Sequence, residues 1–145
     1  MEWGIEGPAN CTLCDRHPET NFHLFSDCSY INMYWAALGR ITGWDFQDQE
    51  IISLEFSNPI IHKEAKIILV VFATHIIWKE RNEIKHNPGT RVPNFLSIVR
   101  KVWGKIKGRL KYERRHPNAP LTVQLDLLDS NFQYFFENAR NSLPI

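Results

Sequence analysis

Apolar side chains recur at steps of three and four residues over much of the chain, which predicts a mainly α-helical domain. The clearest case is residues 94–115, where one face of the expected helix is apolar. That face carries Phe95, Val99, Val102, Trp103, Ile106 and Leu110. The sequence HPNAP at residues 116–120 breaks the chain behind it, so we expect the helix to end near Arg115.

Residues 64–86 predict a second long helix, apolar nearly all round in its first half and charged in its second half. A helix with this pattern is usually buried, so we expect it at the centre of the core. The sequence NPG at residues 87–89 ends it. Its longest apolar run, residues 67–78, is too short to span a bilayer, and we expect no membrane partner.

Shorter elements flank these two helices. Residues 1–22 show no periodicity and predict a loop. A short helix is expected after Cys28, with Ser29 as its N-cap and Gly39 at its end. Its apolar face carries Ile31, Trp35 and Leu38. We expect Trp35, Trp78 and Trp103 to be core residues, because each lies on an apolar helical face.

Two segments are less regular. Residues 48–56 fit either a short helix or a strand, and periodicity does not decide between them. Residues 121–141 predict a short strand or extended segment and then a helix whose apolar face carries Phe132, Phe135 and Phe136. At 145 residues and 43% apolar composition, the chain is expected to form a single domain, residues 1–145, with its own core.

All cysteines of the chain lie in the stretch CTLCDRHPETNFHLFSDC, residues 11–28. Cys11, Cys14, His23 and Cys28 form the pattern C-x2-C-x8-H-x4-C. Zinc prefers four tetrahedral thiolate and imidazole ligands, and two closely spaced pairs are its usual source. We therefore predict a small N-terminal CCHC loop that binds a structural Zn²⁺ ion, followed by a helical core at residues 29–115.

Three alternatives compete with this interpretation of the cysteine stretch. The first is three buried thiols and an ordinary histidine without a metal, because free cysteine often behaves as a small hydrophobic residue. His17 is a rival ligand, but Pro18 follows it and the four-residue step to Cys28 favours His23. A zinc deaminase would need H-x-E upstream of P-C-x-x-C, whereas here the two elements come in the reverse order. Four protein ligands leave no coordination position for a water, so we expect no enzymatic activity.

The thiols also bear on location. Three closely spaced cysteines do not suit a disulfide framework, and the first ten residues lack the apolar stretch of a secretory signal. We expect a reduced, intracellular protein of the nucleus or cytoplasm.

The net charge of +1 conceals a strong local asymmetry. Residues 100–115 hold eight bases and one acid, which gives this segment +7 and leaves −6 for the rest of the chain. The bases are Arg100, Lys101, Lys105, Lys107, Arg109, Lys111, Arg114 and Arg115. Such density of one sign predicts binding of RNA or DNA phosphates without sequence preference. The alternative is a zinc-stabilised protein–protein interaction module whose basic helix docks an acidic partner.

The zinc spacing, together with a later WKERN element, resembles the zinc-binding region C-terminal to the reverse transcriptase of non-LTR (LINE-type) retrotransposons. The matching residues in the first part of the chain are Cys11, Cys14, Glu19, His23, Leu24, Phe25, Cys28 and Trp35. Those in the second part are Trp78, Glu80, Arg81 and Asn82. Arg81 and Asn82 lie at the polar end of the helix predicted for residues 64–86. Either they are solvated or cap the helix, or they have the structural or nucleic-acid-binding role that the resemblance implies.

This resemblance implies the tail of a larger protein that binds nucleic acid, with a reverse transcriptase domain as a partner in cis or in trans. The chain has no Tyr-x-Asp-Asp motif and no room for a polymerase palm. A non-catalytic segment is therefore expected.

Overall fold

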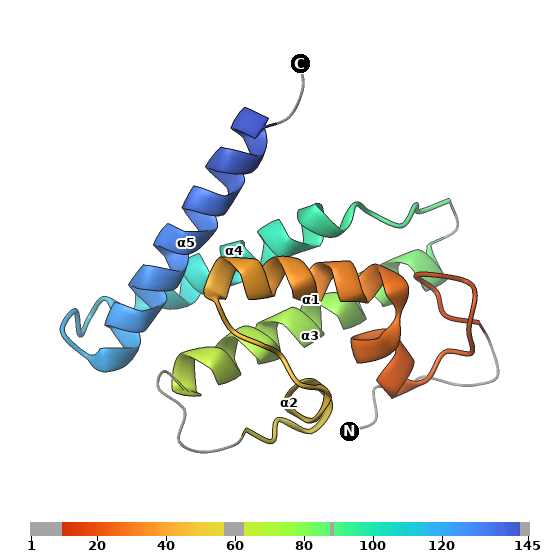
Figure 1. The fold of residues 1–145 in the computed structure, drawn as a ribbon, viewed down its shortest axis with the longest axis horizontal. Helices are drawn as coiled ribbons and strands as arrows, with labels where there is room; N and C mark the ends of the chain where they lie inside the picture. The colour runs from red at the N-terminus through yellow and green to blue at the C-terminus, as the bar shows by residue number, and fades with distance from the viewer. Residues whose placement is uncertain (1–9, 57–62, 88, 143–145) are drawn as a thin grey trace.

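The computed structural model describes residues 10–56, 63–87 and 89–142, and side chains as far as Asn138. These residues form one π-helical turn and five α-helices (Figure 1). In chain order they are η1 (His23–Asp27), α1 (Ser29–Thr42), α2 (Asp48–Ser53), α3 (Lys63–His86), α4 (Phe95–Glu113) and α5 (Pro120–Ser142). The described part of the chain contains no β-strand beyond an isolated bridge between Asn10 and Pro18. The mainly α fold class is confirmed.

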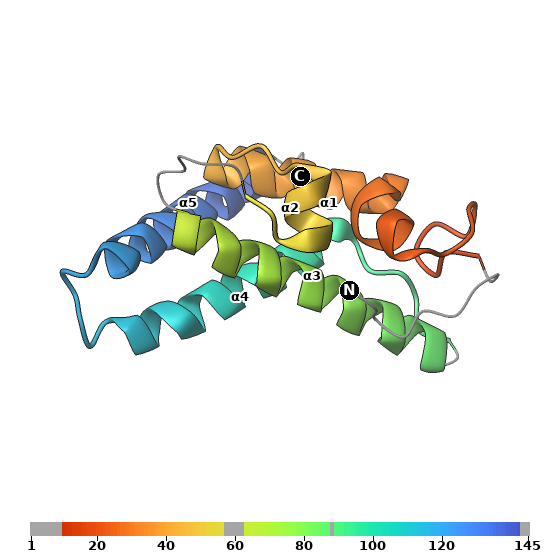
Figure 2. The same ribbon diagram turned by 90° about the horizontal axis from the view of Figure 1, so that it is seen from below.

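Helix α4 packs against each of α1, α3 and α5. Its inward face buries Ile98, Val99, Val102, Ile106 and Leu110, close to the set that the periodicity predicts. Helix α4, which carries most of the bases of residues 100–115, is therefore as central as α3, the helix expected at the centre of the core. Figure 2 shows α4 and α5 joined by a short turn and running back along one another, and the C-terminal half of α5 projects beyond the bundle (Figure 1).

Helix α1 differs from the prediction at both ends. Cys28, not Ser29, is the N-cap, and the helix continues through Gly39 to Thr42, where Gly43 takes a left-handed conformation with φ of 75°. Gly39 has a packing role instead, because a Cβ there would lie 3.1 Å from the carbonyl oxygen of Trp44. Of the two glycines Gly39 and Gly43, the second ends the helix.

The ambiguous segment at residues 48–56 forms a helix at Asp48–Ser53. Gln47 and Glu50 form a capping box at its start, which satisfies two backbone N–H groups. Lys66 of α3 places its Nζ 3.0 and 2.9 Å from the two carboxylate oxygens of Glu50. This ion pair is nearly fully buried and fastens α2 to α3.

The extended segment expected near residue 121 is wrong, because helix α5 begins at Pro120 and is continuous to Ser142. Proline suits the first turn of a helix because its fixed φ is already helical and its missing N–H is not needed there. Five side chains at helical spacing are buried along it: Leu121, Leu125, Leu128, Phe132 and Phe136. The Thr122 hydroxyl donates to the carbonyls of Glu113 and His116 at 3.1 and 2.7 Å, which closes the turn from α4.

Two glycine substitutions should have opposite effects on stability. Gly104 lies within α4 and has open space where a Cβ would lie, so Gly104→Ala should raise the free energy of unfolding by about 0.5 to 1 kcal/mol. Gly43→Ala should lower it, because φ is positive there. Urea unfolding of the zinc-loaded protein, followed by circular dichroism, measures both. A Gly104→Ala variant less stable than the wild type would contradict the position of α4.

Candidate metal centre

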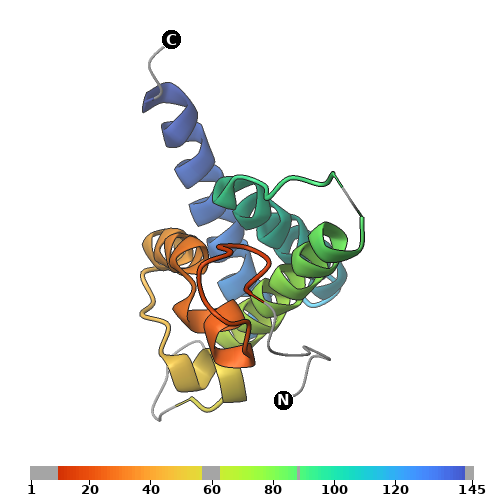
Figure 3. The same ribbon diagram turned by 90° about the vertical axis from the view of Figure 1, so that its right-hand side faces the viewer.

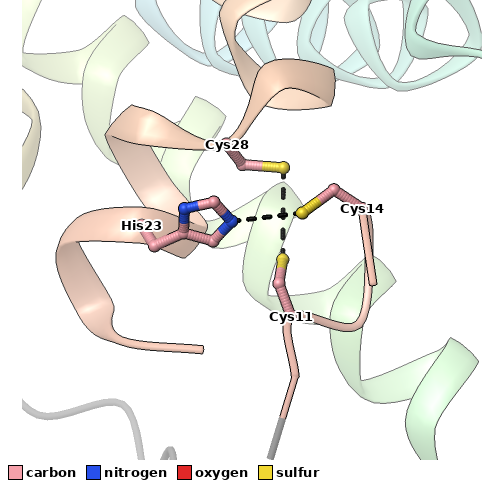
Figure 4. Close-up of side chains that lie close together, drawn as sticks. All are labelled: Cys11, Cys14, His23 and Cys28. Atoms are coloured by element: carbon pink, nitrogen blue, oxygen red, sulfur yellow. Dashed lines mark hydrogen bonds between the residues drawn. The ribbon is translucent and has the colours of Figure 1, made fainter. Parts of the chain in front are cut away.

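Three thiols and one imidazole converge beside the start of α1 (Figure 4). The Sγ atoms of Cys11 and Cys28 are 4.0 Å apart, and Sγ of Cys14 is 3.2 Å from Nε2 of His23. All four ligand atoms lie within 4.8 Å of one another. A tetrahedral zinc ion with zinc–sulfur distances of about 2.3 Å needs ligand separations of roughly 3.5 to 3.8 Å. Small movements of the side chains therefore suffice to bind one ion.

The first pair of thiols comes from a tight turn. The N–H of Asp15 donates to the carbonyl of Cys11 at 2.8 Å, and the N–H of Cys11 donates to the carbonyl of His17 at 2.7 Å. Asp15 has a positive φ of 56°, a conformation that aspartate tolerates better than most residues. This turn directs both sulfurs of the C-x2-C pair to the same side.

The second pair depends on the π-helical turn His23–Asp27. The N–H of Cys28 donates to the carbonyl of His23 at 2.8 Å, five residues back. In an α-helix, residues five apart point about 140° away from each other. The wider π turn rotates His23 and Cys28 toward the same side, and such turns are frequent at functional sites. The four-residue spacer between them is thus long enough to place both ligands on one ion.

A carboxylate lies near the other nitrogen of the histidine ring. Nδ1 of His23 lies 3.7 Å from a carboxylate oxygen of Asp27, while Nε2 is directed at the thiols. A carboxylate on the far side of a ligating imidazole fixes its orientation and raises its basicity. His17 is exposed, and its ring lies 5.3 Å from that of His23, outside the cluster. The structure thus brings together His23, and not the rival His17, with the three cysteines.

The thiols interact directly when no metal is bound. The hydrogen bond to Cys28 and burial both raise the pKa of Cys11. The same hydrogen bond lowers the pKa of Cys28 against the effect of burial. Zinc binds thiolates, so its binding to these cysteines would release protons.

The arrangement suits a structural ion. Cys11, His23 and Cys28 are buried and Cys14 is half-buried, so the centre has little contact with solvent. Four protein ligands complete a tetrahedral shell and leave no position for a reacting water. An ion bound here would link the N-terminal turn, the π turn and the N-cap of α1.

A buried ion pair attaches this loop to the helical bundle. Glu19 accepts a hydrogen bond from the N–H of Thr12, between the first two cysteines, at 2.8 Å. Its other oxygen accepts one from Nε of Arg81 on α3 at 2.9 Å, and Nη2 lies 2.7 Å away. The two side chains are only 2% and 3% exposed. Burial opposes the charge on Glu19, but the Thr12 N–H and the Arg81 guanidinium outweigh it and lower the pKa of that carboxyl.

Sequence reasoning named Glu19 and Arg81 only through the resemblance and did not pair them. A signal was present in the pattern of α3. Val70, Ala73, Ile77 and Arg81 follow one another at helical steps on the same buried face. An arginine at a core position predicts a buried carboxylate partner, because a lone buried charge is strongly unfavourable. Arg81 is therefore neither solvated nor a helix cap, and the structure shows a structural role for it.

Aromatic residues complete the attachment. Leu24 and Phe25 of the π turn are buried, and the indole N–H of Trp35 on α1 donates to the carbonyl of Phe25 at 2.7 Å. Trp35 is a core residue as expected, whereas Trp78 and Trp103 are only half-buried. The zinc loop, residues 11–28, is therefore fixed to α1 and α3 by different contacts.

The basic residues predicted to meet phosphates lie far along the chain on α4 and just after its end. Seven of the eight are exposed, and Arg109 is half-buried. Three form ion pairs: Lys101 with Glu80, Arg109 with Glu113, and Arg114 with Asp126. These acids belong to the helical bundle and not to the zinc loop, so the two groups of predicted site residues are separate.

Comparison with known protein families gives a match to the N-terminal part of the chain. Residues 1–35 match the family of zinc-binding regions in reverse transcriptase. The match contains all four ligands, Glu19 and Trp35, while residues 78–82 lie outside it. The comparisons with curated proteins and with solved structures give no match. The matched family is a zinc-binding one, and the Cys3His cluster fits a structural zinc site. No helix among the described residues has the length and apolar character needed to cross a membrane.

Removal of zinc should unfold the zinc loop before the bundle. Structural zinc sites contribute about 10 to 16 kcal/mol in peptides, far more than this loop can gain by burying Leu13, Leu24 and Phe25. Hydrogen exchange measured by mass spectrometry, with and without a chelator, should show faster exchange at residues 11–28 than at residues 95–113. Unchanged protection at residues 11–28 after the zinc is removed would contradict this.

Two histidine variants provide the matched control. His23→Ala should reduce the zinc content well below about one ion per chain. His17→Ala should leave it unchanged, although the two rings are neighbours. Metal analysis of the two purified variants measures the difference.

Arg81→Met should destabilise the zinc-loaded protein by about 3 to 5 kcal/mol, because Glu19 would be left as a buried charge without a partner. Urea unfolding measures this loss. Lys85→Met, one turn later on the exposed side of α3, should change stability by less than about 0.5 kcal/mol. In a double-mutant cycle with Glu19→Gln, the two losses should not add. Simple additivity would mean that the ion pair does not fasten the loop.

Proposed function

We propose that this chain is a non-catalytic, zinc-stabilised domain that binds RNA or DNA through the outer side of α4, with little sequence preference. The observation that carries the proposal is a set of five bases that have no carboxylate partner among the described residues. They are Arg100, Lys105, Lys107, Lys111 and Arg115. Each is exposed to solvent.

The geometry of α4 supports contact with a phosphate backbone. At about 100° per residue, Arg100, Lys107 and Lys111 fall on one flank of its outer face, and Lys105 falls on the other. Gly104 and Gly108 lie between the two flanks, with open space above them. A polyanion can therefore approach the helix backbone closely while charged side chains reach it from both sides. Phosphate contacts carry no base information, which is why we propose low specificity.

The remaining surface favours the same orientation. Outside residues 100–115 the chain carries a net charge of −6. An acidic remainder repels a polyanion, so the electrostatic field directs it to the side of the domain that bears α4. The inner face of α4 is buried against three other helices, which holds the basic residues in a fixed arrangement.

The family match supports a role beside a polymerase. Residues 1–35 match a zinc-binding region found in reverse transcriptases. We infer that the domain acts as the tail of a retroelement (LINE-type) reverse transcriptase, in cis or in trans, and helps to hold its template or target. Such a protein would work in the nucleus or cytoplasm, where its thiols stay reduced.

The salt dependence of binding tests this function. If the five unpaired bases meet phosphates, a plot of log K against log salt for duplex DNA should have a slope of about −4 to −5. Fluorescence anisotropy with labelled duplex at several salt concentrations measures it. The triple variant Lys105→Ala, Lys107→Ala, Lys111→Ala should reduce the slope to about −2.

A matched triple variant removes the same charge elsewhere. It combines Arg40→Ala, Lys85→Ala and Arg91→Ala, at exposed positions outside α4. This variant should change the slope by less than about one. If both triple variants changed the slope equally, the net charge of the protein alone would determine binding. No saturable binding to either RNA or DNA, with capture of an acidic protein instead, would favour a protein-interaction module.

A further inference from the structure

A cavity of about 410 Å³ opens between α4 and α5. Its volume lies within the range of roughly 300 to 1,000 Å³ that holds small organic ligands. The α4 side contributes Arg100, Trp103 and Lys107, and the α5 side contributes Asp129, Gln133, Phe136 and Glu137. One wall is therefore basic, the other is acidic or amide-bearing, and aromatic rings lie between them.

The aromatic part of this cavity is rigid. The rings of Trp103 and Phe136 are nearly parallel, with an interplanar angle of 8° and centroids 5.5 Å apart. Phe132, which is fully buried, continues the arrangement at 6.3 Å from Trp103. The indole N–H donates to Asp129 at 2.7 Å, which fixes the plane of the ring. An aromatic surface held in this way needs no reorganisation to stack on a planar ligand.

Two cations lie directly over these rings. Nζ of Lys107 is 3.8 Å from the centroid of the Trp103 ring, and the Arg100 guanidinium is 4.2 Å from that of Phe136. Neither base has a carboxylate partner among the described residues. Lysine has a flexible stem, so its ammonium can leave the ring when a flat aromatic group replaces it. The displaced ammonium would then be free to contact a neighbouring phosphate.

The far wall supplies groups for the edge of such a ligand. The carboxamide of Gln133 offers donors and an acceptor and bonds to Glu137 at 3.0 Å. A nucleobase has donors and acceptors on its edge and a π-face that stacks on indole. In a duplex both features are occupied by pairing and stacking. Only an unpaired base can therefore enter this cavity.

We propose that the cavity between α4 and α5 binds one unpaired base of a single-stranded nucleic acid, stacked on Trp103, while the bases of α4 hold the adjoining phosphates. This inference rests on the proposed function and adds to it a preference for single strands. Trp103 is then a ligand-binding residue as well as a partly buried packing residue, which explains why it is only half-buried.

The test uses the zinc-loaded full chain and a strand of about 12 nucleotides that carries a central 2-aminopurine. The wild type should bind the single strand several-fold tighter than the matching duplex and should quench the 2-aminopurine fluorescence. Trp103→Leu should weaken binding of the single strand about tenfold and abolish the quenching, with duplex binding changed less than about twofold. Trp103→Phe should retain most of both signals.

Two further variants separate stacking from charge and from misfolding. Gln133 is exposed, so we expect Gln133→Leu to leave the fold unchanged. This variant should reduce the affinity for the single strand and the quenching, but not the affinity for the duplex. Lys111→Ala lies outside the cavity and should weaken both substrates equally. Two outcomes would overturn this inference if the wild type still binds the duplex. One is that Trp103→Leu and Gln133→Leu weaken the affinity for single strand and duplex equally. The other is that the wild type does not quench the 2-aminopurine fluorescence. If the wild type binds neither substrate, the proposed function itself fails.

Discussion

The ion pair between Glu19 and Arg81 joins two parts of the chain that are 62 residues apart in sequence. A zinc ion would hold residues 11–28 together and join them to the start of α1, but it would make no contact with α3. A buried carboxylate that accepts from both Thr12 and Arg81 has only one position that satisfies it. Because an unpaired charge in that position would be strongly unfavourable, the pair selects one docking of the loop. Local metal geometry thereby becomes part of the tertiary structure.

The attachment extends from the loop to α4 through α1. Cys28 belongs to the Cys3His cluster and is also the N-cap of α1, so a bound ion would hold the start of that helix. Two residues later, the Tyr30 hydroxyl donates to the carbonyl of Pro93 just before α4, and burial raises the pKa of Tyr30 to about 12. Figure 3, viewed from the side of the zinc loop, shows α1 and α4 behind it. The metal centre is separate from the basic residues but continuous with the framework that presents them.

The sequence predicts well whatever is local. The zinc ligands follow from their spacing, and the two long helices follow from periodicity, since both signals are confined to a few turns. The errors come from tertiary contacts. A glycine at position 39 predicts the end of α1, but the structure shows that the close approach of the Trp44 carbonyl explains the glycine there. The helix ends at Gly43 instead. Likewise, apolar residues at 121–128 resemble a strand until their i, i+4 repeat is extended to Phe132 and Phe136. The Glu19–Arg81 pair could not be found locally.

The position of the acids, more than that of the bases, defines the proposed nucleic-acid surface. Glu80 on α3, Glu113 on α4 and Asp126 on α5 neutralise three of the eight bases. Counting bases in the sequence therefore overstates the charge available to phosphates. Two of the bases that remain, Arg100 and Lys107, lie over aromatic rings at the cavity between α4 and α5. In the proposed complex the same side chains would meet a phosphate or uncover a stacking face, and this coupling of charge to an aromatic surface would distinguish a single strand from a duplex.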